Sequence, residues 1–223
     1  MNRVSAIVPT LDEAVALPSL LAALHAEVDE IVVVDGGSTD ATERLATDGG
    51  ARLVRSPRGR GPQLNRGAAA ATGDVLWFLH ADTRLAAGSG AALRGTDAAW
   101  GCFAVTVDDP DPRLRFAGRW MTARARRTSS CTGDMGIWCR RDFFLDIGGF
   151  AELPVLEDLD FSDRARVRET AEVLAPVLGT SARRWRGEGV NRTILRMWAV
   201  RASWRLGLSP RRIVRWYTSA PRD

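Results

Sequence analysis

Residues 30–40 read EIVVVDGGSTD, a short apolar run that ends in an acid, two glycines and polar residues. Such Val- and Ile-rich runs are typical of strands buried in a parallel sheet. Similar runs lie at Val4–Val8, Arg52–Val54 and Val75–Leu79. Segments with helical spacing separate them: a stretch with Ala14, Leu17, Leu20, Leu21 and Leu24 on one face, then Thr39–Ala46 and Gln63–Ala71. This alternation predicts an α/β protein with an open, mostly parallel, doubly wound sheet, in which ligands bind beyond the carboxyl ends of the strands.

The second half of the chain alternates less regularly. We expect strands at Ala98–Val107 and Met135–Arg140, helices at Pro112–Arg127 and Val155–Arg168, and a short helix that ends at Gly148-Gly149. Residues 190–217 have a helical pattern that breaks near Gly207 and Pro210. We therefore expect a catalytic domain over residues 1–189 and a C-terminal helical extension over residues 190–223 that packs on it.

The composition narrows the function classes. The chain has 223 residues, 45% of them hydrophobic, and a formal net charge of +4. All 31 basic residues are Arg, which excludes mechanisms that need a lysine amine, such as a Schiff base. The arginines fit either a compositional bias of the source or contacts with phosphates or anionic lipid. No nucleic-acid-binding module accompanies them, so we expect no nucleic-acid partner.

The cysteines and the apolar runs bear on location. Cys102, Cys131 and Cys139 are odd in number and match no zinc or CxxC spacing, which favours a reduced, cytoplasmic setting. The N-terminus lacks the layout of a signal peptide, and no apolar run reaches the roughly 18–20 residues of a membrane-spanning helix. Peripheral contact with the inner face of the membrane, and a homo-oligomer, both stay open.

Polar residues follow each of the first two predicted strands. Residues 9–13 read PTLDE, in which an acidic pair opens the next helix, and this pair fits simple helix capping. Asp35 ends the second strand and is placed to accept hydrogen bonds from a base or ribose, while the two glycines after it allow close approach of a ligand. Ser38 or Thr39 could instead cap the next helix in a turn that binds nothing.

Three further stretches carry candidate chemistry. Residues 58–67 read RGRGPQLNRG, a basic, Gly-rich loop that offers amides and guanidinium groups to phosphates but lacks the Walker ending and does not follow the first strand. Asp82 follows the fourth strand and suits Mg²⁺ or Mn²⁺, with His80 nearby as a nucleotide contact, metal ligand or structural residue. Residues 156–160 read LEDLD, where adjacent carboxylates suit either a general base or an acidic helix start.

In this order, the stretches resemble the inverting glycosyltransferase family 2, which has a glycosyltransferase-A fold. Residues 9–13 resemble its opening Pro-x-x-Asn-Glu, with Asp12 in place of Asn, and residues 34–40 resemble its uracil-binding Val-Asp-Asp-Gly-Ser-x-Asp. Residues 61–67 match its Gly-x-x-x-Asn-x-Gly helix start, residues 80–82 fall at its Asp-x-Asp, and Glu157-Asp158 falls on its Glu-Asp motif. The resemblance covers roughly residues 3–185.

The resemblance implies inverting, metal-dependent transfer of a sugar from a nucleoside-diphosphate sugar, a UDP-sugar foremost, to a small or lipophilic acceptor. It implies Asp158 as the base and Asp82 as the ligand of Mg²⁺ or Mn²⁺. The residues that it implies for donor binding are Pro9, Thr10, Glu13, Asp35, Gly37, Arg58, Arg60, Gly61, Asn65, Arg66, His80 and Ala81. Those that it implies for acceptor binding are Gly133, Asp134, Glu157, Arg184 and Trp185.

Two departures refine these expectations. His80 replaces the first Asp of Asp-x-Asp, which affects ribose or diphosphate contacts more than the metal. Ser181 replaces the Gln of the Gln-x-x-Arg-Trp of processive synthases, so we expect single transfer. The chain also resembles short bacterial members of the family that are assigned to arsenosugar biosynthesis or carotenoid-acid glycosylation. The competing hypotheses are a non-catalytic nucleotide-sugar-binding or membrane-associated protein and a sugar nucleotidyltransferase.

Overall fold

A seven-stranded sheet organises the chain, with the strand order β3-β2-β1-β4-β6-β5-β7. The computed structural model describes residues 2–217, without the side chains of Arg184, Trp216 and Tyr217. The strands of the first half are β1 (Val4–Thr10), β2 (Glu30–Asp35), β3 (Arg52–Arg55) and β4 (Val75–Phe78), and they pair in parallel. Their register places Thr10 of β1 beside Asp35 of β2, so these strands end at one edge of the sheet. The predicted mostly parallel α/β sheet is confirmed.

The helices of the first half lie close to their predicted positions, with different starting points. They are α1 (Leu17–Leu24), α2 (Thr42–Asp48) and α3 (Arg60–Ala70). Ala14 precedes α1 instead of belonging to it. Neither Ser38 nor Thr39 caps α2, because hydrogen bonds hold both residues in the turn before it. The prediction of a cap at either residue is therefore wrong.

The second half contains elements that the sequence pattern did not reveal. The expected ones are β5 (Trp100–Asp108), α5 (Pro112–Thr128), β6 (Trp138–Arg140), α6 (Arg141–Asp146), α7 (Glu157–Arg168), α9 (Val190–Arg205) and α10 (Pro210–Tyr217). A 3-10 turn, Gly133–Met135, precedes β6. The unexpected ones are α4 (Ser89–Gly95), β7 (Glu172–Ser181) and α8 (Arg183–Glu188). β6 runs antiparallel between β4 and β5, while β7 pairs in parallel with β5.

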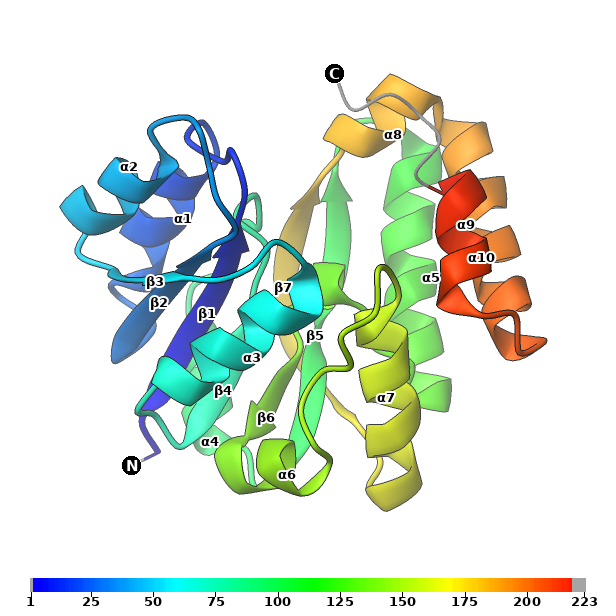
Figure 1. Ribbon diagram of the computed structural model, residues 1–223. Helices are drawn as coiled ribbons and strands as arrows, with labels where there is room; N and C mark the ends of the chain where they lie inside the picture. The colour runs from blue at the N-terminus through cyan, green and yellow to red at the C-terminus, as the bar shows by residue number, and fades with distance from the viewer. Residues whose placement is uncertain (1, 218–223) are drawn as a thin grey trace.

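Apolar side chains on both faces of the sheet form the core. One cluster includes Ile7, Val34 and Phe78 from the strands, Leu64 from α3 and Phe161 from α7. The cluster on the other face joins the leucines of α1 to strand residues and to Leu93 of α4. The three cysteines are buried and free. Figure 1 shows α3, α6 and α7 in front of the sheet, with α5, α9 and α10 side by side to the right of it.

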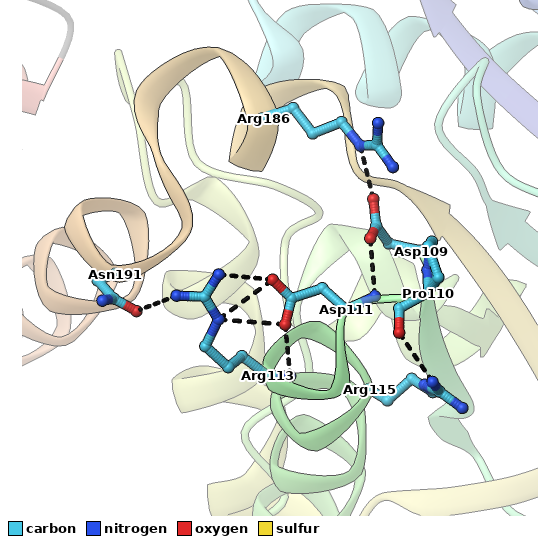
Figure 2. Close-up of polar contacts among 7 residues, drawn as sticks. All are labelled: Asp109, Pro110, Asp111, Arg113, Arg115, Arg186 and Asn191. Carbon is cyan, nitrogen blue, oxygen red and sulfur yellow. Dashed lines mark hydrogen bonds and ion pairs between the residues drawn. The ribbon is translucent and has the colours of Figure 1, made fainter.

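Polar contacts attach the C-terminal helices to the junction between β5 and α5 (Figure 2). Arg186 of α8 donates to the largely buried carboxylate of Asp109 at 2.6 Å. Arg113 of α5 binds Asp111, which caps α5, and also donates to Asn191 of α9 at 3.1 Å. These contacts fix the start of α9 against α5. Among residues 2–217, no helix has both the length and the apolar composition needed to cross a membrane.

Asp35 organises the turn where β2 meets the edge of the sheet. Its carboxylate is buried and accepts hydrogen bonds from the amides of Gly37 and Ser38 at 2.8 Å, from the hydroxyl of Ser38, and from Thr10 at 3.2 Å. Burial raises the pKa of Asp35, but these hydrogen bonds outweigh it and hold the pKa below its ordinary value of 3.8. The turn is thus built around an ionised carboxylate.

The close approach of α3 to the sheet yields the first prediction. A Cβ atom at Gly67 would lie 2.3 Å from the Cγ2 of Ile7 and 2.9 Å from the Cγ2 of Val34. We expect Gly67→Ala to lower the free energy of unfolding by about 1–3 kcal/mol, because the core must shift to admit the methyl group. Urea denaturation measures the effect. Gly95→Ala is the control, since that Cβ meets no atom within 4 Å; equal destabilisation of both variants would contradict the packing argument.

The turn at Asp35 yields a prediction about pH. We expect Asp35→Asn to lower the free energy of unfolding at neutral pH by about 1–3 kcal/mol, because buried donors lose a charged acceptor. A lowered folded pKa means that the carboxylate stabilises the fold above pH 3.8 and that this stabilisation disappears as the pH falls from there through the folded pKa. The difference between wild type and variant should therefore shrink in acid.

Urea denaturation at a series of pH values, with Asp48→Asn as the control, measures this difference. Asp48 makes only a solvent-exposed pair with Arg44, so its loss should change little. A stability gap between wild type and Asp35→Asn that stays constant from neutral pH into acid would contradict the role of the ionised carboxylate.

Candidate functional site

Residues from three distant segments meet where β1, β4 and β7 end. Glu13 follows β1, Asp82 follows β4, and Arg183 begins the helix after β7. One guanidinium nitrogen of Arg183, Nη2, lies 3.2 Å from Glu13 and 3.1 Å from Asp82. Both carboxylates raise the pKa of Arg183, with Asp82 as the larger contributor. The predicted metal residue and one predicted donor residue thus converge on a single cation.

The structure permits a test of whether a divalent metal fits here. Among residues 2–217, no group of three or more His, Cys, Asp or Glu side chains is arranged to hold a metal ion. The carboxylates of Asp82 and Glu13 nevertheless face one position, which the guanidinium of Arg183 occupies and which a metal ion could take in its place. Mg²⁺ is commonly held by one or two carboxylates plus phosphate and water. The two acids therefore fit a metal that shares its ligands with a diphosphate, and Asp82 would hold it.

The predicted nucleotide residues lie at the same edge of the sheet. Pro9 and Thr10 end β1, and Ala81 directly precedes Asp82. Gly37 is exposed and has a φ of 96°, in the left-handed region that favours glycine. Asp35 lies beneath it, with its carboxylate engaged by the turn. Asp35 thereby positions the exposed backbone of Gly37, and a direct contact of its own with a base requires the turn to open.

The residues expected to form a basic loop mostly belong to α3, which begins at Arg60. Arg58, before the helix, is exposed, whereas Arg60 lies 3.7 Å from the carboxylate of Glu157. Gly61 allows the first turn of α3 to pass the carbonyl of Ala151, which a Cβ atom would approach to 2.4 Å. Arg60 thus reaches the acidic pair on α7.

Two other residues predicted for donor binding make internal contacts. Asn65 bonds the backbone of Phe150 in both directions, at 2.8 and 2.9 Å, and so ties α3 to the loop before α7. Arg66 donates to the carbonyl of Arg55 at 3.3 Å. In the described structure, both side chains stabilise the walls around the site.

The acidic pair on α7 faces the turn that precedes β6. Asp158 accepts a hydrogen bond from the amide of Gly133 at 2.9 Å, and His80 lies 3.3 Å from Asp134. A Cβ atom at Gly133 would lie 2.6 Å from the Nε2 of His80, so only glycine leaves room for the imidazole. The structure thus brings the predicted base, His80 and two predicted acceptor residues into one cluster.

Glu157 and Asp158 differ sharply in their environments. Glu157 is buried, and burial raises its pKa, as does the neighbouring charge of Asp158, while Arg60 opposes the shift. Asp158 is partly exposed and accepts a second hydrogen bond, from the amide of Leu159 at 2.8 Å. Leu156, just before the pair, has a φ of 70°, a strained conformation for a Leu. Asp158 is therefore the member of the pair that an acceptor can reach.

The remaining predicted acceptor residues lie in the C-terminal part. Trp185 is buried and packs with Val107, Leu114 and Ala182, beneath α9. Arg184 was predicted alongside it, but its side chain lies outside the described residues. Trp185 contributes to the wall of an apolar pocket instead of touching the acidic pair directly.

Three residues at the site escaped the sequence patterns. Arg183 joins Glu13 and Asp82, although the motif pointed to its neighbours. Arg124 of α5 donates to the carbonyl of Ser130 at 3.1 Å, close to the turn that holds Gly133. Thr132, which precedes Gly133, has a buried hydroxyl without a hydrogen-bond partner among the described residues. The partners of Arg183 are distant in sequence and that of Arg124 is a backbone atom, so no short motif signals them.

Comparisons with known proteins show which families and folds this chain resembles. Residues 5–89 match the model of the family described as Glycosyl transferase family 2. A TPR repeat-containing protein of Synechococcus elongatus is 40% identical over 87 residues, which cover 38% of this chain and 22% of that protein. Glucosyl-3-phosphoglycerate synthase of Mycobacterium tuberculosis is 34% identical over 94 residues, which cover 36% of this chain and 29% of that protein. The chain thus spans less than a third of these two relatives.

The fold itself recurs in a solved structure. The crystal structure of glucosyl-3-phosphoglycerate synthase from Mycobacterium tuberculosis, in complex with Mn²⁺, UDP and glucosyl-3-phosphoglycerate, has a TM-score of 0.55 and 22% sequence identity. The similarity covers 80% of this chain and 71% of that one. The chain therefore has the glycosyltransferase-A fold. Residues 5–89 are thus similar to glycosyl transferase family 2, and the fold is shared with a glucosyl-3-phosphoglycerate synthase.

Proposed function

We propose that this protein transfers a sugar from a nucleoside-diphosphate sugar, a UDP-sugar foremost, to a small or lipophilic acceptor, once per encounter and with inversion. The observation that carries the proposal is the convergence of two charged clusters at the carboxyl edge of the sheet. One comprises Glu13, Asp82 and Arg183, and the other comprises His80, Asp134 and Asp158. The first suits a metal-bound diphosphate, and the second suits an acceptor oxygen that must lose a proton.

In the proposed donor complex, the nucleotide lies over the ends of β1 and β2. Thr10 and the exposed backbone of Gly37 border the base and ribose, and Arg60 and Arg183 supply positive charge for the diphosphate. A divalent metal held by Asp82 would stabilise the negative charge of the leaving diphosphate as a Lewis acid. His80, two residues before Asp82, orients Asp134 and borders the sugar.

The proposed transfer is a single displacement. The acceptor oxygen forms a bond to the anomeric carbon while the bond from that carbon to the diphosphate breaks, and the acceptor proton passes to the carboxylate of Asp158. The amides of Gly133 and Leu159 fix the orientation of that carboxylate. Each of its oxygens keeps lone-pair capacity for the incoming proton. One displacement inverts the anomeric centre.

Several broader expectations belong to this proposal. Residues 1–189 act as the catalytic domain and residues 190–223 as a helical extension. The protein works in the cytoplasm, where the extension could touch the inner face of the membrane or a second copy of the chain. Arsenosugar and carotenoid-acid pathways stay predictions that rest on resemblance.

The assignment of Asp158 as the base predicts a selective loss of turnover. We expect Asp158→Asn to lower kcat by about 10²–10⁴-fold, because an amide cannot accept the acceptor proton. Donor binding should change little, because Asp158 does not belong to the cluster around Asp82. Release of nucleoside diphosphate in a donor screen with Mn²⁺, with and without lipophilic and small polar acceptors, measures turnover. Asp146→Asn, an exposed carboxylate on α6, is the control. Near-normal turnover of Asp158→Asn would overturn the assignment.

The assignment of Asp82 predicts a loss of metal-dependent donor binding. We expect Asp82→Asn to abolish the gain in UDP affinity that Mn²⁺ confers, because the metal loses its protein carboxylate. Calorimetric titration of UDP, with Mn²⁺ or with a chelator present, measures this gain. Asp108→Asn, which removes a carboxylate paired with exposed Arg84 at the end of β5, should behave as wild type. An unchanged response to Mn²⁺ in Asp82→Asn would place the metal elsewhere.

A further inference from the structure

An apolar pocket lies beside the acidic pair, between α5, α7 and α9. Its volume is about 410 Å³, and aromatic and aliphatic side chains form most of its walls. Phe116 and Trp120 come from α5, and Trp198 and Trp204 come from α9. Leu159, which follows Asp158 directly, lines the end that adjoins α7. One residue in the wall of this pocket, hereafter the α5–α7–α9 pocket, is thus the chain neighbour of the proposed base.

Polar contacts at both ends keep the pocket open. The indole nitrogen of Trp204 donates to Asp163 of α7 at 2.7 Å, which ties the end of α9 to α7. At the start of α9, Asn191 accepts from Arg113 of α5 (Figure 2). Between these contacts, Trp198 stays 59% exposed, Trp120 49% and Phe116 67%. Large apolar side chains that stay exposed around a concave site mark a place for an apolar ligand.

The charges around the pocket are unequal. Arg124, Arg201 and Arg205 contribute to its lining, against one carboxylate, Asp163. Asp163 is engaged by Trp204 and lies 2.9 Å from Arg166. Arg124 forms no ion pair with a carboxylate among the described residues; its guanidinium donates only to the carbonyl of Ser130 and, weakly, to the sulfur of Met135. Burial is the largest influence on the pKa of this guanidinium and lowers it. A partly buried guanidinium without a carboxylate partner favours a ligand that brings its own negative charge.

We propose that the α5–α7–α9 pocket binds the apolar body of the acceptor, and that this acceptor is an anionic amphiphile whose charged group contacts Arg124 next to Asp158. This inference rests on the proposed function, because it names the acceptor class of the same site. Because Leu159 lines the pocket and follows Asp158 in the chain, the apolar part of the ligand lies among the tryptophans and its polar end points to Asp158. A neutral, small polar acceptor would leave the aromatic walls in water.

Two fluorescent probes test the pocket without knowledge of the natural acceptor. Anilinonaphthalenesulfonate is anionic, and N-phenylnaphthylamine shares its ring system without the sulfonate. Titration of the full chain, read by energy transfer from tryptophan, gives the affinity of each. We expect the anionic probe to bind one site per chain, and Trp198→Ala to weaken it about tenfold or more, since a lost aromatic anchor is costly. Leu145→Ala, an exposed residue on α6, is the matched control.

The charge argument has its own pair of variants. Arg124→Gln should weaken the anionic probe several-fold and leave the neutral probe unchanged, and Arg201→Gln repeats the test at a second arginine of the lining. Circular dichroism verifies that each variant is folded. If both probes bind equally and neither substitution separates them, the anionic part of the proposal is wrong. If Trp198→Ala and Leu145→Ala bind the anionic probe equally, the pocket assignment is wrong.

Further measurements distinguish a failure of this proposal from a failure of the proposed function, and an acceptor from other ligands of the pocket. UDP with Mn²⁺ should not displace the anionic probe, and displacement would overturn the pocket assignment. The probe should bind Asp158→Asn as it binds wild type, while that variant loses transfer. Failed UDP binding with intact probe binding would count against the donor assignment alone. If the chain binds phosphatidylglycerol vesicles through Trp198 and the probe does not inhibit this binding, the face belongs to lipid and the proposal is wrong. If the chain instead dimerises through Trp198, the face belongs to a second copy and the proposal is also wrong.

Discussion

The parallel pairing of β1 with both β2 and β4 is the constraint on which the site depends. It places Thr10 beside Asp35 and brings the end of β4, with Asp82, to the same edge. α3 lies very close to these strands, which Gly67 permits. A buried, hydrogen-bonded Asp35 then fixes the turn after β2. The strand ends therefore determine where the candidate functional side chains lie.

The first half of the chain could be predicted well because each buried strand is a continuous apolar run. β7 was missed for a physical reason: Pro176 and Gly179 interrupt its pattern, and its pairing with β5 shifts register between Phe103 and Ala104. An edge strand tolerates a proline that an interior strand would not. α8 and α4 are too short for a helical period to emerge. Most candidate site residues were predicted from the order of the motifs along the chain. Arg183 and Arg124 were not, since their surroundings form only after folding.

The neighbouring acids Glu157 and Asp158 have different surroundings. Glu157 is buried against Arg60, and its raised pKa reflects both burial and the charge of Asp158. Asp158 lies at the N-terminal end of α7, and the amides of Gly133 and Leu159 donate hydrogen bonds that fix the orientation of its carboxylate. The strained backbone at Leu156 is a local cost of presenting both acids at the first turn of the helix.

The match to the family ends at residue 89, before the elements that hold the acidic pair and the pocket. The proposed donor site therefore lies largely within the matched residues, whereas the proposed acceptor site lies beyond them and rests on the residues of this chain alone. Those residues are unusual in combination: tryptophans and arginines share one concave face, and Asp163, its one carboxylate, is already engaged. An aromatic wall would serve any apolar ligand, but an arginine without a carboxylate partner selects among them by charge. The specificity of the enzyme would then reside in Arg124, a residue that no motif marks.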